Sequence, residues 1–175
     1  IPAFDLLAAL ETMPELFIKF GGHKQAAGVT LEAARIPELR ARMAEIGATQ
    51  LTHEDLLPRL RIDAPLGLRE ISGAVVAGLS RMGPFGAGNP KPVFRASPIE
   101  LIEKPRILKE RHLALMVRQD GRAFRAMAWR FSDREPYLNA NRSGLELAYS
   151  LEQNEFRGEK VTELSVADVR RPVAV

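Results

Sequence analysis

The sequence predicts an α+β protein in which a small α/β lobe precedes a barrel of five short strands. Apolar residues recur at helical spacing through the first half of the chain, and beyond Pro92 they follow the two-residue period of strands. Residues 1–84 carry nine Lys and Arg against ten Asp and Glu, whereas residues 85–175 carry sixteen against twelve. We therefore expect a lobe at 1–55, a connecting strand and helix at 56–84, and the barrel at 85–175.

Composition restricts the class of protein. Apolar residues make up 46% and charged residues 27% of the 175 residues, which is typical of a globular chain. No apolar run approaches the roughly 18 residues that span a bilayer, and no signal peptide opens the chain. The lack of cysteine excludes disulfides and thiolate metal sites and is typical of a reducing compartment. We therefore expect a cytoplasmic protein, and the start at Ile1 predicts a piece of a longer chain.

In the lobe, apolar residues at helical spacing predict a short helix that runs to about Met13, where Pro14 interrupts or restarts it. Residues 29–31 have the pattern of a short buried strand, and residues 36–46 that of an amphipathic helix. The connecting segment begins with a half-exposed strand at 60–64, which Pro65 ends.

An amphipathic helix is expected from Leu68 to Met82, with a stop at Gly83-Pro84. Residues 82–92 contain three glycines and three prolines, so we place the domain boundary there. A flexible linker is the alternative. Phe85 in the middle of this segment favours an ordered turn.

The second half predicts a small oligonucleotide-binding (OB) type of barrel, with a β-sandwich as the competing architecture. Asp120-Gly121 is a favoured hairpin turn, and residues 154–158 supply another turn. The expected strands are 93–102, 112–118, 123–131, 145–153 and 161–169.

The segment Gly21–Gly28 concentrates backbone freedom, a histidine and a cation. Two adjacent glycines permit close approach to a ligand, and Lys24–Ala27 is good helix-forming material, so we expect a helix start that binds an anion, with Gly28 as the helix stop. The alternative is a plain strand-to-helix turn in which His23 is structural. His53 is interpreted as structural. His112 either caps a strand, which is the favoured interpretation, or contacts a phosphate, and the spacing of the three histidines predicts no metal site.

Basic residues are densest between Lys104 and Arg130, a segment that contains eight Lys and Arg but only two Asp and Glu. This zone indicates a polyanion partner, or else a solvated surface. Trp129 is the best candidate to stack on a base of single-stranded nucleic acid. The candidate DNA-binding residues are Lys104, Arg106, Lys109, Arg111, Arg118, Arg125, Trp129 and Arg130.

Three segments resemble known motifs. Residues 21–28 resemble the Gly-Gly-His-x-x-Ala-Ala-Gly motif of the DHH-associated domain in DHH phosphoesterases. Residues 84–94 resemble the Pro-Phe-Gly-x-Gly-Asn-Pro-x-Pro-x-Phe signature of the RecJ family of bacterial single-strand-specific exonucleases. Residues 154–158, running on to 168–170, are similar to that family's last barrel strands. The resemblance spans nearly the whole chain in the right order.

The resemblance implies a parent enzyme that degrades single-stranded DNA from its 5′ end in repair and recombination, with Mn²⁺ or Mg²⁺ bound by a preceding DHH catalytic domain. It implies that His23 contacts the scissile phosphate, with Gly21, Gly22 and Lys24 on the substrate side, and that this chain binds DNA without cutting it. Glu163 departs from the glutamine of many relatives.

Docking of a single-strand-binding protein is left open by the sequence. The sequence also leaves open the alternative that the chain is a non-catalytic module that binds single-stranded nucleic acid. The editing-type DHH-associated domain of alanyl-tRNA synthetase is disfavoured, because the signature after residue 84 has no place there.

Overall fold

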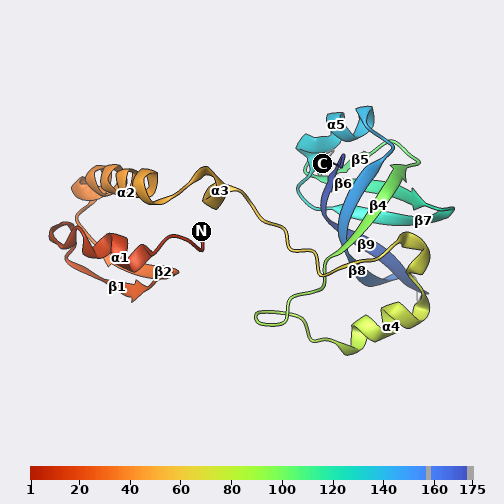
Figure 1. The fold of residues 1–175 in the computed structure, drawn as a ribbon, viewed down its shortest axis with the longest axis horizontal. Coiled ribbons are helices and arrows are strands. Elements are labelled where there is room, and N and C mark those ends of the chain that lie inside the picture. Colours follow the sequence, from red (N-terminus) through yellow and green to blue (C-terminus); the bar gives the residue numbers. More distant parts are fainter. Residues whose placement is uncertain (157–158, 173–175) are drawn as a thin grey trace. The chain divides into compact units, whose positions relative to one another are not determined.

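The computed structural model describes residues 1–156 and 159–172. The chain divides into two compact units, Ile1–Arg59 and a second that begins at Leu60 (Figure 1). Residues 60–84, which we expected to form a connection, therefore belong to the second unit, because Leu68 and Val76 are buried in the core of that unit.

The first unit combines three α-helices with a small hairpin. Asp5 caps the first helix by accepting a hydrogen bond from the Ala8 amide, at 3.0 Å. The helices at Leu6–Glu11 and Ile36–Gln50 confirm the two helices that the periodicity predicts. Its elements are α1 (Leu6–Glu11), the 3₁₀ turn η1 (Pro14–Leu16), β1 (Lys19–His23), β2 (Ala26–Thr30), η2 (Ala33–Arg35), α2 (Ile36–Gln50) and α3 (His53–Leu56).

The segment Gly21–Gly28 is an antiparallel hairpin, so the predicted helix start, and Gly28 as a helix stop, are wrong. Gly21 pairs with Gly28 and His23 with Ala26, which leaves Lys24 and Gln25 as the turn. Four residues of good helix formers cannot offset the cost of nucleating a helix, whereas strand pairing satisfies the backbone groups along the whole segment. Of the short strand predicted at 29–31, Val29 and Thr30 belong to β2 and Leu31 does not, and Val29 is exposed rather than buried.

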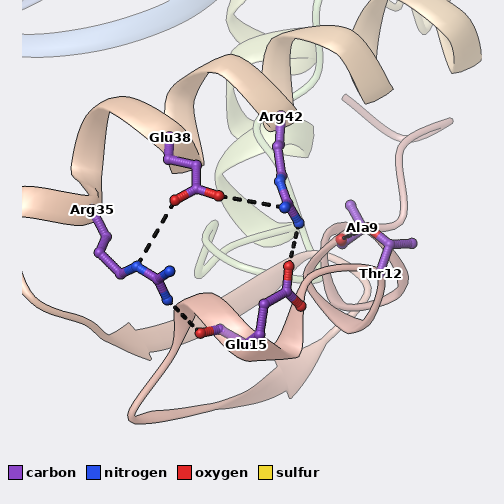
Figure 2. Close-up of polar contacts among 6 residues, drawn as sticks. All are labelled: Ala9, Thr12, Glu15, Arg35, Glu38 and Arg42. Carbon is purple, nitrogen blue, oxygen red and sulfur yellow. Dashed lines mark hydrogen bonds and ion pairs between the residues drawn. The ribbon is translucent and has the colours of Figure 1, made fainter.

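Ion pairs join α2 to the η1 turn that leads into β1 (Figure 2). The Arg42 guanidinium contacts the Glu15 carboxylate and lies 3.3 Å from Glu38. Arg35 donates a hydrogen bond to the Glu15 carbonyl oxygen and lies 3.8 Å from Glu38. Both this network and the burial of Leu16 hold η1 in place.

The second unit contains a barrel with three flanking helical segments. Of the strand expected at 60–64 only Ala64 is in a strand, and Pro65 belongs to that strand rather than ending it. Pro65 is tolerated because the Asp63 amide donates to the Val93 carbonyl and the Leu66 amide to the Arg95 carbonyl of β4. The elements are β3 (Ala64–Pro65), η3 (Leu68–Glu70), α4 (Gly73–Arg81), β4 (Phe94–Leu101), β5 (Arg106–Leu108), β6 (His112–Gln119), β7 (Arg122–Ala128), η4 (Ser132–Arg134), α5 (Glu135–Ala140), β8 (Leu145–Phe156) and β9 (Glu159–Arg170).

The helix predicted at 68–82 is divided in two. Ser72 accepts a hydrogen bond from the Val75 amide, at 3.3 Å, and so caps α4 at its start. The segment around Phe85 is an ordered turn, as expected, since the Asn89 side-chain amide donates to the carbonyls of Met82 and Pro84. No helix in the described part of the chain is long and apolar enough to cross a membrane.

Five strands close the barrel in the order β4–β6–β7–β9–β8–β4, with β7 and β9 parallel and the other pairs antiparallel. This confirms the OB-like fold and the five predicted strands. The third strand ends at Ala128 rather than Phe131, because Arg130 adopts a left-handed conformation with φ of 62°. Of the turn predicted at 154–158, residues 154–156 instead belong to β8, and residues 157 and 158 lie outside the described residues.

Alternate residues of the barrel strands fill its interior. Leu113, Leu115 and Val117 of β6 are buried, as are Leu147 and Tyr149 of β8. The Tyr149 hydroxyl donates to the Leu66 carbonyl, at 2.7 Å, and burial raises its pKa far above the ordinary value, so it remains a neutral donor. The opposite side chains of β6 and β7 are therefore left to form an outer face.

Candidate nucleic-acid interface

The outer face of β6 and β7 carries sulfur-containing and basic side chains. Met116 pairs with Arg125 and Ala114 with Met127, and all point away from the interior residues that alternate with them. Arg118 lies near the end of β6, where it donates to the Glu100 carboxylate at 2.6 Å. In five-stranded OB barrels, this pair of strands is the surface that binds oligonucleotides.

A groove of about 1100 Å³ opens between α4 and the first residues of β7 and β9. Phe124 and Met116 contribute apolar surface, and the described lining residues include no carboxylate. The Arg122 guanidinium lies 5.4 Å from the centre of the Phe124 ring and donates to the Ile71 carbonyl at 3.4 Å. The cations that line the groove are Arg81, Arg122, Arg125 and Lys160.

The far end of the same face carries an aromatic pair. Trp129 is 52% exposed and meets the His112 ring edge-on, with centroids 4.9 Å apart. His112 Nδ1 accepts a hydrogen bond from the Arg130 amide, at 3.0 Å. Burial lowers the pKa of His112, and the charges of Arg111, Lys109 and Arg130 lower it further, so the ring is neutral at neutral pH. Arg111 and Arg130 are the chain neighbours of His112 and Trp129, so cations flank the aromatic pair.

The structure thus distributes the predicted DNA-binding residues over several places, and it pairs Arg118 with the Glu100 carboxylate. Arg125 lines the groove, and Lys109, Arg111, Trp129 and Arg130 gather at the aromatic end. Lys104 and Arg106 are exposed on the connection between β4 and β6.

Three groove residues were missing from the predicted site. Arg122 belonged to the basic zone but was not selected, and nothing in the sequence marked Arg81 or Lys160. Only closure of the barrel and packing of α4 bring residues 81, 122 and 160 together, so pattern alone offers no signal for them.

In the first unit, the His23 and Lys24 side chains are exposed near the end of the hairpin. The Lys24 carbonyl accepts a hydrogen bond from the Leu6 amide at 2.9 Å, which fixes the turn against α1. A Cβ on Gly21 would meet no atom within 4 Å, whereas one on Gly22 would lie 2.4 Å from Ala27 Cα. Gly22 is therefore required by the hairpin, and Gly21 leaves the backbone open to a ligand.

No three His, Asp or Glu side chains of the described residues gather in an arrangement that could hold a metal ion. These residues do not fit a divalent-metal centre, and we derive no metal-dependent step for them.

A family model described as the RecJ OB domain matches residues 62–168. The chain belongs to the RecJ family. The single-stranded-DNA-specific exonuclease RecJ of Salmonella typhimurium is 35% identical over 173 residues, which cover 94% of this chain and 29% of that protein. The enzyme of the same name from Bacillus subtilis is 27% identical over 96% of this chain and 21% of its own length.

A crystal structure of RecJ from Thermus thermophilus in complex with Mg²⁺ superposes with a TM-score of 0.75 and 29% identity, over 99% of this chain and 26% of that one. A second structure of that protein contains Mn²⁺. The resemblance inferred from the three motifs is therefore confirmed, and the chain spans less than a third of the RecJ proteins that it matches.

Proposed function

We propose that this chain is the substrate-binding part of a RecJ-type exonuclease and binds single-stranded DNA along the β6–β7 face. The observation that carries the proposal is the groove beside α4, in which four cations and an aromatic ring occur together without a carboxylate in the described lining. Cations follow the phosphates of a single strand while its bases stack on exposed rings. Trp129 is the exposed ring available on this path, and the cations around His112 continue it.

In the same proposal, the Gly-Gly-His hairpin contacts the phosphate that is cleaved. His23 would donate a hydrogen bond to a phosphate oxygen on which charge develops, and the Gly21 backbone would approach closely because no side chain intervenes. Lys24 adds a positive charge beside it. Hydrolysis from the 5′ end would take place at Mn²⁺ or Mg²⁺ held by a preceding DHH catalytic domain, so this chain alone would bind without cutting.

The cellular role that follows is processing of single strands in DNA repair and recombination. A single-strand-binding protein, which coats such substrates, belongs to the proposed partners.

The proposal is tested by the fluorescence anisotropy of a labelled oligothymidylate titrated with this chain at about 50 and about 200 mM salt. Binding should weaken as salt rises, because each neutralised phosphate releases counterions. Replacement of Arg122 by alanine should reduce the salt slope by roughly one contact. Arg40→Ala, on α2 in the other unit, is the matched control. Binding that is indifferent to salt, or a preference for duplex DNA, would contradict the proposal.

A further inference from the structure

A second cavity, of about 370 Å³, lies against α4 beside the groove. We call it the Phe85 pocket. Val76, Ser80 and Gln153 line both cavities, so the pocket and the groove are neighbours that share these side chains. A strand whose phosphates follow the groove cations would pass the mouth of this pocket.

The ring that forms one wall of the pocket is held in place. Phe85 is half-buried and begins a tight turn in which the Gly86 amide donates to the Asn89 carbonyl at 2.8 Å. The Asn89 side chain donates to the Met82 and Pro84 carbonyls at 3.0 and 2.9 Å, on either side of Gly83. This turn fixes the position of the ring before any ligand arrives, so little conformational entropy is lost on binding.

The chemistry of the walls suits a planar, polar-edged group. Leu79 and Leu151 supply apolar surface in addition to Phe85, and the amides of Gln153 and Asn154 offer both donors and acceptors. Lys91 and Glu152 also line the pocket and neutralise each other in an ion pair of 2.9 Å. Asn154 donates to the Glu163 carboxylate at 2.7 Å, which orients its amide. The volume falls at the lower end of the range for small-ligand sites, the size of one nucleoside.

We propose that the Phe85 pocket receives one nucleobase of the single strand that lies in the groove. This inference rests on the proposed function. The position of the pocket beside the groove, and the complementarity between the groove cations and the DNA backbone, argue for a base over an apolar protein side chain as the occupant. A base held in a duplex is paired and stacked, so the pocket favours unpaired strands without reading their sequence.

The experiment is photo-crosslinking of this chain to an oligothymidylate that carries 5-iododeoxyuridine, with the linked residues mapped by mass spectrometry. A link at Phe85 is expected in addition to one at Trp129. Phe85→Leu, which keeps apolar volume, should abolish the first link, retain the second and weaken binding by roughly 5- to 100-fold, as expected for loss of one stacked base. Tyr137→Leu, which removes an exposed ring of α5 outside both cavities, is the matched control and should change neither link.

The outcomes separate the two proposals. Links at Trp129 but not at Phe85, with unchanged affinity of Phe85→Leu, would overturn the pocket and leave DNA binding by the face intact. Failure of the wild-type chain to bind or link single strands would overturn both. Circular dichroism of Phe85→Leu checks that the variant folds, and the wild-type link at Phe85 decides the question independently of any variant.

Discussion

The Glu163 carboxylate lies 3.5 Å from the Arg125 guanidinium, so an acid of β9 is paired with a cation of the groove. Glu163 is 15% exposed at its side chain, and its other oxygen accepts the hydrogen bond from Asn154. The acid is therefore held in place rather than free to swing away. A phosphate that approaches Arg125 competes with this carboxylate, and a glutamine at the same position would not compete.

Glu163→Gln should raise the affinity for single-stranded DNA by roughly three- to tenfold, because it releases Arg125 and removes a negative charge near the phosphates. The dependence on salt should steepen by about one phosphate contact. Anisotropy titrations at several salt concentrations measure both quantities. Glu45→Gln, which removes an exposed acid of α2, is the control. Equal or weaker binding by Glu163→Gln would show that the pair supports the binding geometry.

Trp129 is the only tryptophan of the chain, so its intrinsic fluorescence reports on one place. Addition of oligothymidylate should quench this fluorescence if a base stacks on the exposed ring. Trp129→Ala should weaken binding by about 1–3 kcal/mol, the range for one base stacked on an aromatic side chain, and Trp129→Phe should retain most of the affinity. Fluorescence that stays constant while the anisotropy of the DNA rises would remove Trp129 from the interface.

The strands of the barrel were predictable because burial imposes a two-residue period that the sequence displays directly. Leu145, Leu147 and Tyr149 all occupy interior positions. The hairpin was not predictable in the same way, since neither of its strands has a buried face: Gly21, His23 and Val29 are all exposed. Its pairing depends on backbone hydrogen bonds, which leave little trace in side-chain pattern.

The sequence also predicted only part of the candidate site. The basic zone of the sequence located Arg125 and Trp129, because both lie on strands or turns inside that zone. The groove also needs Arg81 from a helix and Lys160 from the last strand. No local pattern connects residues so far apart, and only the closed barrel does.

Gly22→Ala should destabilise the hairpin, whereas Gly21→Ala should not. Gly22 has a φ of 152°, and an added Cβ would lie 2.4 Å from the Ala26 carbonyl oxygen, so the backbone has to shift at a cost of about 1–3 kcal/mol. Hydrogen exchange of the β1 and β2 amides measures the effect within this unit. Equal protection in the two variants would mean that the hairpin relaxes around the new methyl group.

The contact between Glu15 and Arg42 predicts a pH dependence in the first unit (Figure 2). A hydrogen bond from its own backbone amide, and then the one from Arg42, hold the pKa of Glu15 below its ordinary value near 4.5. Because the folded pKa is the lower one, the stabilisation is complete above the ordinary value and is lost as pH falls through the folded pKa.

Arg42→Ala should raise the pKa of Glu15 toward the ordinary value without reaching it, since the backbone hydrogen bond remains. Carboxyl chemical shifts followed by NMR during an acid titration measure this change. The variant should also loosen α2 from η1 at neutral pH, where the wild-type carboxylate is charged, and hydrogen exchange of the η1 amides should rise accordingly. Arg40→Ala, on the same helix, should change neither quantity. A Glu15 titration unaffected by Arg42→Ala would mean that the ion pair does not persist in solution, and that burial of Leu16 holds η1 without it.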